Sequence, residues 1–292
     1  MARSIRNLVA VLAVCAAVVP FSPAPAQAIA YGKNAPDGAY RFSVQLVMTG
    51  LPDADGGTRD SSCSGALIAP EWVITAGHCF RDGDKRVSRT VAERTTAIVG
   101  RTDLSSDDGQ EVEVVAAYQA EGHDVALARL GEPVTGITPL PVSTRAPQRG
   151  DVLRLTGYGL VGDGGGNVPA TRLQTGLFTV TAFGDSLLET SGRWPRTQTS
   201  PCPHDSGGPY FREQRDGKVA LAAVVSSGPG CPHAGPDFSA RTDNLVGWIN
   251  DTMDAPPSSW NVPGVTGVAG VVLAAIGLLV LAGRRRRTGA HR

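Results

Sequence analysis

Three residues in separate segments of the chain could together hydrolyse an amide bond. His78 stands in the run Thr-Ala-Gly-His-Cys, Asp124 precedes the apolar run Val-Ala-Leu, and Ser206 stands in Asp-Ser-Gly-Gly-Pro. Amide hydrolysis at neutral pH needs a nucleophile, a base that takes its proton, a group that holds this base in one tautomer, and donors for the oxyanion. A serine in a turn, a histidine and a carboxylate at the start of an apolar strand could supply the first three.

The order of these segments and the residues around them resemble the chymotrypsin/trypsin-like serine protease family. The resemblance runs from Ile29 to about Met253 and includes both cysteine pairs of that stretch. It implies that Ser206 is the nucleophile, that His78 is the general base and then acid, and that Asp124 orients His78. The implied activity is that of an endopeptidase, which acts on peptides or proteins through an acyl-enzyme without a metal or an organic cofactor.

The sequence departs from the family pattern just before the nucleophile. The family has a glycine whose N–H forms the oxyanion hole together with the N–H of the serine, and here the two residues are His204 and Ser206. A Cβ restricts the backbone angles that glycine enters freely, so the N–H of His204 could be misaimed. The alternative to an active enzyme is therefore a catalytically impaired member that acts as an extracellular binding module.

The resemblance also implies how the site is activated. In the family, a new N-terminal ammonium pairs with the aspartate before the nucleophile, which is Asp205 here. Residues 1–28 are typical of a secretory signal, because arginines precede an apolar run that ends in the small-x-small pattern Ala-Gln-Ala. Cleavage after this pattern would expose Ile29, so we expect export and activation to be one event.

Four residues are expected to bind the substrate: Ser200, Ser226, Gly228 and Asp237. Ser226 is also expected to support Asp124. The resemblance places Ser200 at the base of the specificity pocket, which by itself implies a neutral pocket. Asp237 falls on the opposite wall of the pocket base, where its carboxylate could bind a cationic side chain or could be covered and leave a smaller apolar pocket. A third alternative is an exposed position on a loop. We predict a basic or mixed preference that is governed by Asp237.

The composition indicates an all-β domain. The chain has 36 glycines and 21 prolines but only 5% aromatic residues, which favours short strands joined by tight turns. The resemblance implies two packed six-stranded antiparallel β-barrels and a C-terminal helix, with the site in the cleft between the barrels. Strands are predicted at Ser43–Met48, Gly65–Ile68, Val114–Ala117, Val125–Leu130, Val152–Leu155 and Val219–Val225, and a helix at Thr242–Met253 that is capped by Thr242 or Asp243.

Cysteine usage agrees with export. After removal of the signal the chain contains Cys63, Cys79, Cys202 and Cys231, which are expected to form disulfides in an oxidising compartment. Four cysteines allow three pairings, and sequence proximity favours Cys63–Cys79 with Cys202–Cys231. A metal site is not expected, because no Cys-x-x-Cys spacing is present.

The C-terminal region is predicted to anchor the protein in a membrane by a single helix. Residues 262–283 carry no charge, are long enough to cross the hydrocarbon core, and are followed at once by four arginines. Positive charge stays on the cytoplasmic side, which predicts an extracellular protease domain at 29–253. A linker at 254–261 and a basic cytoplasmic tail at 284–292 complete this organisation.

The charge balance excludes two classes of protein. The chain has 27 Lys+Arg against 27 Asp+Glu and a hydrophobic content of 41%, so it is neither disordered nor a protein that coats nucleic acid. The abundance of arginine over lysine, with much alanine and glycine, is typical of high-GC bacteria such as actinomycetes.

Overall fold

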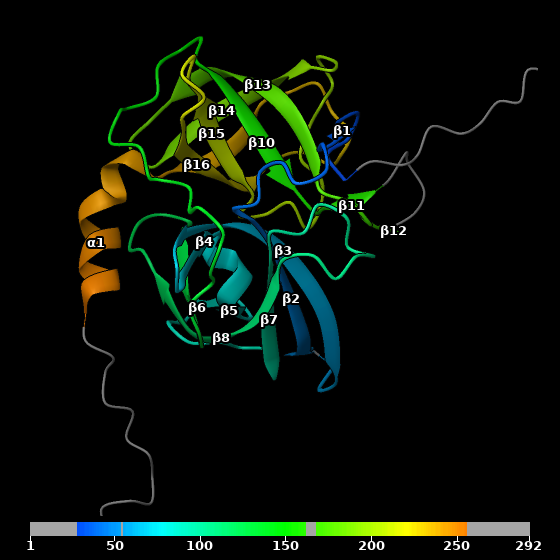
Figure 1. Ribbon diagram of the computed structural model, residues 1–292, viewed down its shortest axis with the longest axis vertical. Helices are drawn as coiled ribbons and strands as arrows, with labels where there is room; N and C mark the ends of the chain where they lie inside the picture. The colour runs from blue at the N-terminus through cyan, green and yellow to red at the C-terminus, as the bar shows by residue number, and fades with distance from the viewer. Residues whose placement is uncertain (1–27, 54, 162–167, 256–292) are drawn as a thin grey trace, which may run out of the picture. The chain divides into compact units, whose positions relative to one another are not determined.

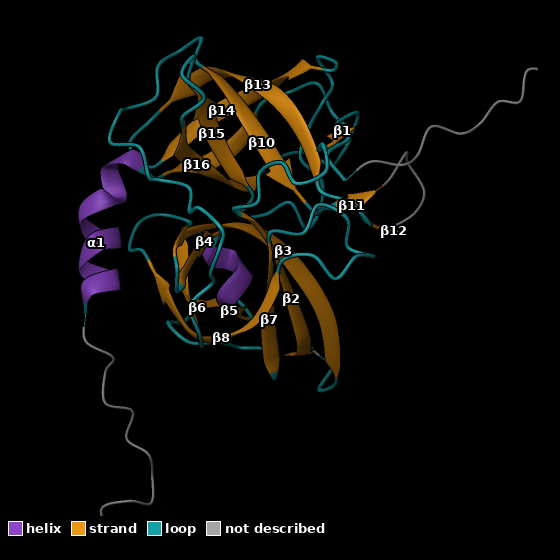
Figure 2. Ribbon diagram, in the orientation of Figure 1, coloured by secondary structure: helices purple, strands orange, loops and turns teal. Residues whose placement is uncertain are grey.

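The computed structural model describes residues 28–53, 55–161 and 168–255 (Figure 1). The described residues up to Val246 belong to one compact unit, which is built almost entirely from β-strands (Figure 2). The second unit is described from Gly247 to Ala255, which includes the rest of the helix α1.

The first half of the compact unit is a closed antiparallel barrel. Its strands follow the order β2-β3-β4-β9-β8-β7, so that the last strand pairs with the first and no edge is left open. Alternate side chains point inward, and those of Leu46, Leu67, Ile74 and Leu127 are fully buried. The strands are β2 (Ser43–Pro52), β3 (Thr58–Ala69), β4 (Trp72–Thr75), β7 (Arg94–Val99), β8 (Gln110–Gln119) and β9 (Ala126–Leu130).

The second half forms another closed antiparallel barrel, in the order β13-β10-β15-β16-β17-β14 with β14 pairing back to β13. The short strand β1 (Lys33–Asn34) adds to β13 outside this ring. Ile29, Leu155, Phe178 and Tyr210 lie in its buried core. The strands are β10 (Val152–Gly157), β13 (Gln174–Phe183), β14 (Leu187–Trp194), β15 (Pro209–Glu213), β16 (Val219–Ser227) and β17 (Asp237–Arg241).

The expectation of two six-stranded barrels is therefore confirmed, and each of the six predicted strands lies within or closely overlaps an observed one. Two small ribbons and two 3₁₀ turns complete the described elements. They are β5 (Arg81–Asp82) with β6 (Lys85–Arg86), β11 (Leu160–Val161) with β12 (Val168–Pro169), and the turns Gly77–Phe80 and Asp243–Leu245.

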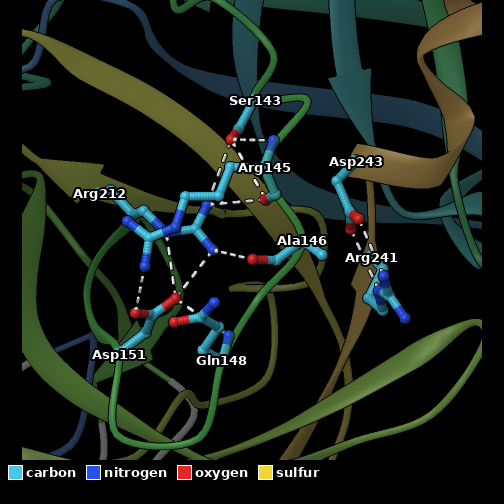
Figure 3. A network of polar contacts seen from close by, with 8 residues as sticks. All are labelled: Ser143, Arg145, Ala146, Gln148, Asp151, Arg212, Arg241 and Asp243. Carbon is cyan, nitrogen blue, oxygen red and sulfur yellow. Dashed lines mark hydrogen bonds and ion pairs between the residues drawn. The ribbon is translucent and has the colours of Figure 1, made fainter.

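The helix prediction needs a correction at its N-terminus. α1 spans Val246–Asp254 and follows the 3₁₀ turn, whose cap residue Thr242 makes no side-chain capping bond. Asp243 does not cap either, because its carboxylate is held by the guanidinium of Arg241 at 2.8 and 3.1 Å (Figure 3). In the part of the chain that is described, no helix is long and apolar enough to cross a membrane, and the predicted span at 262–283 lies outside that part.

Two hydrogen bonds join strands β2 and β3 of the first barrel to the C-terminal end of β10 in the second barrel. Ser43 of β2 and Thr156 of β10 share a hydrogen bond of 2.8 Å between their hydroxyl groups. The hydroxyl of Ser64 in β3 accepts the N–H of Tyr158, just after β10, at 2.9 Å. These bonds hold β2 and β3 of the first barrel against the end of β10 in the second.

A buried arginine fastens the segment between the barrels to β15. Arg212 is 8% exposed, and its guanidinium donates to Asp151 Oδ2 at 2.9 and 3.2 Å (Figure 3). The same guanidinium donates to the Ser143 hydroxyl at 3.2 Å and to the carbonyls of Arg145 and Ala146 at 3.3 and 3.2 Å. One side chain therefore satisfies several acceptors of an irregular segment.

Replacing Arg212 with alanine is expected to lower the free energy of unfolding by about 3–5 kcal/mol, because it leaves the Asp151 carboxylate without its buried partner. Arg145→Ala is the matched control, since Arg145 Nη2 also pairs with Asp151, at 2.8 Å, but its side chain is 57% exposed. An exposed pair contributes about 0–1 kcal/mol. Urea unfolding of both variants measures the difference, and equal small losses would contradict this account of the segment.

Candidate active site

His78 is held in a rigid turn at the inner end of the first barrel. It lies in the 3₁₀ turn Gly77–Phe80, and the next residue, Cys79, forms a disulfide with Cys63 of β3. Its backbone N–H donates to Asp124 Oδ1, and its ring Nδ1 lies 2.8 Å from Asp124 Oδ2. The two bonds fix both the position and the orientation of the imidazole relative to one carboxylate.

A third hydrogen bond to Asp124, in addition to the two from His78, comes from the second barrel. The hydroxyl of Ser226, in β16, donates to its Oδ2 at 2.7 Å. Burial acts to raise the pKa of Asp124, but the hydrogen bonds from His78 and Ser226 outweigh it and hold this pKa below its usual value. The carboxylate is thus ionised at neutral pH and faces the ring nitrogen of His78.

Ser206 lies in a turn that packs on strands β3 and β4 of the first barrel. Its carbonyl accepts the N–H of Ser64 at 2.9 Å. The next residue, Gly207, has φ +80°, and a Cβ there would overlap the hydroxyl of Thr75. Only glycine permits this close approach together with this backbone angle. In the described residues Ser206 Oγ makes no hydrogen bond to His78, a contact that often tightens only when substrate binds.

Two backbone N–H groups at this turn are available to an oxyanion. Among the described residues, neither the N–H of His204 nor that of Ser206 donates to another protein group. His204 adopts φ +76°, the region that glycine enters freely, so its Cβ has not driven the backbone into the usual angles. Its Nδ1 lies 2.6 Å from Ser62 Oγ, and burial together with the Arg59 charge lowers the pKa of His204.

Asp205 points away from this turn into the protein. Its carboxyl group accepts the N–H groups of Gly159 and Cys202, each at 2.9 Å. A Cβ on Gly159 would lie 2.6 Å from the carboxylate, so this position requires glycine. Burial raises the pKa of Asp205 to about 7, and the two N–H donors offset only part of that effect. The sequence-predicted partner Ile29 is also fully buried.

A cavity of about 190 Å³ opens beside Ser206. Asp237 lies in its wall directly beside Gly228, where an added Cβ would be 2.5 Å from Asp237 Oδ1. Asp237 is 2% exposed, which excludes the exposed-loop alternative. Burial and the charge of Asp205 raise the pKa of Asp237 to about 8. The lining residues are Pro201, Cys202, Pro203, Ser206, Val225, Ser226, Ser227, Gly228, Pro229, Gly230, Cys231 and Asp237.

The second disulfide, Cys202–Cys231, joins two walls of this cavity. Ser200 is buried but does not line it, and its hydroxyl accepts the N–H of His233 at 3.3 Å. The ring of His233 in turn lies 3.0 Å from Asp237 Oδ1, while Asp237 Oδ2 has no partner among the described residues.

Sequence reasoning missed three residues that contact the site: His233, Ser62 and Ser64. The two serines flank Cys63 and therefore share one face of β3, a period-2 pattern that could have drawn attention to them. His233 carried no such signal, because it lies in a loop rich in proline and glycine whose course the sequence does not determine.

Comparisons with known proteins show the family to which the sequence is similar. The family model described as Trypsin matches residues 29–249. A trypsin-like protease of Streptomyces glaucescens is 28% identical over 214 residues, which cover 70% of this chain and 74% of that protein. Serine protease 56 of Mus musculus is 27% identical over 255 residues, 78% of this chain and 39% of that protein. Transmembrane protease serine 9 of Rattus norvegicus is 30% identical over 219 residues, 67% of this chain and 20% of that protein.

Proposed function

This chain belongs to the trypsin family and is a serine endopeptidase, and from that premise we propose that it cleaves peptide bonds outside the cytoplasm through an acyl-enzyme on Ser206. In this reaction Ser206 Oγ attacks the scissile carbonyl and His78 Nε2 takes its proton. Asp124 accepts the Nδ1–H of His78, which leaves Nε2 free as the base and stabilises the imidazolium that forms.

The N–H groups of His204 and Ser206 donate to the oxyanion of the tetrahedral intermediate. His78 then protonates the leaving amine, and the C–N bond breaks to leave an ester on Ser206. Water attacks this ester with His78 again as the base, which releases the second product. The nucleophile Ser206 and the Asp124 partner Ser226 both line the cavity, which supports binding of the substrate there.

The observation that carries this proposal is the carboxylate of Asp124, which takes two hydrogen bonds from His78 and one from Ser226 beside that cavity. The test is a peptide-library cleavage assay with the purified mature protein, in which Ser206→Ala is the control. We expect cleavage by the wild type and none by the variant. Binding of peptides without cleavage would instead support the impaired binding module.

The positive φ of His204 argues against the alternative of a catalytically impaired binding module. The reason to expect impairment was a backbone that a side chain keeps out of glycine's region, and residue 204 occupies that region. The proposal is therefore an active enzyme rather than a degenerate relative.

We expect Asp237 to set a preference for lysine or arginine before the scissile bond. With a pKa of about 8, its carboxyl is protonated below that pH and attracts a cation less. The ratio of kcat/KM for a lysine substrate to that for a leucine substrate should therefore rise between pH 7 and pH 9. Both substrates are cleaved by the same catalytic groups, so any effect of pH on the catalytic groups themselves cancels in the ratio.

Asp237→Gly should abolish this rise and the preference for the lysine substrate. Chromogenic peptides that end in Arg, Lys, Phe, Leu and Ala measure both. A profile that Asp237→Gly leaves unchanged would remove Asp237 from the specificity pocket. The groups that face this carboxyl are His233, at 3.0 Å, and Asp205 through its charge, so the same assay on His233→Gln tests whether the imidazole contributes to the titration.

We also propose that the protease domain works outside the cell while attached to the membrane. Two disulfides are typical of extracytoplasmic proteins, and one relative is named a transmembrane protease. The predicted anchor at 262–283 and all of the predicted signal except Ala28 lie outside the described residues. Membrane fractionation of the full chain and of a chain without 262–292 tests the anchor.

A further inference from the structure

Strand β3 fixes the turn that carries the nucleophile at several points. The hydroxyl of Ser64 donates to the carbonyl of His204 at 3.1 Å, and the N–H of Ser64 donates to the carbonyl of Ser206 at 2.9 Å. One strand position before Cys63, Ser62 Oγ lies 2.6 Å from Nδ1 of His204. β3 therefore holds the backbone of the turn through Ser64 and the side chain of His204 through Ser62.

His204 needs such support because of its backbone angle. A residue with a Cβ is disfavoured at φ +76°, and it stays there only where its surroundings over-determine the conformation. Relaxation to a negative φ would rotate the N–H of His204 relative to that of Ser206. The two donors would then no longer converge on one oxygen atom.

We propose that Ser62 is a positioning residue that keeps the oxyanion hole formed in the absence of the family's glycine. Its hydrogen bond anchors the imidazole of His204, and the anchored side chain holds the backbone at the positive φ. This inference rests on the proposed function, because it assigns Ser62 a part in stabilising the transition state of that reaction. Among the described residues, Ser62 makes no hydrogen bond to the nucleophile Ser206 or to the base His78.

The first test is Ser62→Ala in the mature protein. A hydrogen bond of this kind corresponds to roughly a fivefold to tenfold change, so we expect kcat to fall by about that factor. KM should stay within about twofold, since the bond acts on the transition state. Ser62→Thr should restore kcat, because it keeps a hydroxyl group. Ser61→Ala is the control, as the neighbouring side chain points to the other face of β3 and should leave kcat unchanged.

The second test is a double-mutant cycle with His204→Gly. Glycine needs no anchor at positive φ, so Ser62→Ala should cause no additional loss of kcat in the His204→Gly background. An equal loss in both backgrounds would overturn the inference, because Ser62 would then act independently of His204. A rise in KM at constant kcat would also overturn it, since it would show that Ser62 contacts substrate.

The outcomes separate this inference from the proposed function. A wild-type protein that hydrolyses peptides but is matched in kcat by Ser62→Ala overturns the inference alone. A wild-type protein that hydrolyses nothing and does not react with a fluorophosphonate overturns the proposed function and the inference with it.

Discussion

Asp124→Asn is expected to lower kcat by about 10⁴-fold while the protein stays folded. An amide in this position can donate to Nδ1 of His78, which moves the imidazole proton to Nε2. Nε2, which takes the proton of Ser206 in the proposed reaction, would then already carry a proton and could not accept another. The loss should therefore appear in kcat, with little change in KM.

Glu121→Gln is the matched control for this variant. It makes the same change from carboxylate to amide three residues earlier, at an exposed position. We expect its kcat to stay within about twofold of the wild type, since surface changes of this kind are usually small. A kcat of Asp124→Asn within tenfold of the wild type would contradict the assigned role of Asp124.

Asp205→Asn is expected to lower kcat/KM by about 10²- to 10³-fold. We propose that the new ammonium of Ile29 pairs with this buried carboxylate after cleavage at Ala28. Breaking a buried pair on one side costs about 3–5 kcal/mol, and here it would act on the conformation of the turn that carries His204 and Ser206. A variant with one additional residue before Ile29 should lose activity to a similar extent.

The pH dependence of stability provides a check that does not need activity. In the uncleaved chain the pKa of Asp205 is raised to about 7, above its unfolded value, so the folded state holds a proton that the unfolded state releases. The contribution of Asp205 to the free energy of unfolding should fall by about 4 kcal/mol as the pH rises from about 4 to about 7. The cleaved chain should lack this contribution, because its ammonium compensates the carboxylate, whereas the contribution of Asp237, whose pKa is raised to about 8, should be common to both chains.

Urea unfolding of the uncleaved and cleaved chains at pH 5 and pH 8 measures this difference, and Ser206→Ala can be used throughout to prevent self-digestion. N-terminal sequencing of the active protein identifies the cleavage site. A fully active protein that starts upstream of Ile29, or an equal pH response of both chains, would contradict the proposed activation.

The residues of the candidate site that stand in short sequence motifs were predictable. His78, Asp124 and Ser206 each stand in a local sequence pattern, and the structure places their segments together through bonds from Ser64 and Ser226. The conformation of His204 was not predictable in the same way. Its φ depends on contacts with a strand about 140 residues earlier in the chain, which no local pattern reports.

The fold was predictable in its architecture and less so in its boundaries. The run Gly65–Ile68 predicts only the apolar part of β3, which begins at Thr58 because its polar residues pair with β2 through the backbone. The burial of Asp237 depends on the pairing of β17 with β14 and β16, so it could not be separated from exposure by sequence alone. The prediction that Asp243 caps the helix was wrong because its carboxylate is hydrogen-bonded to Arg241 instead.

Covalent labelling of the mature protein with a fluorophosphonate tests the central claim most directly. Only a serine activated by a neighbouring base should react, so the account predicts one adduct, mapped by mass spectrometry to the peptide that contains Ser206. His78→Ala and Ser206→Ala should abolish the adduct, and Glu121→Gln should retain it. No adduct on the folded wild type, or an adduct on another residue, would contradict the assignment of Ser206 as the nucleophile.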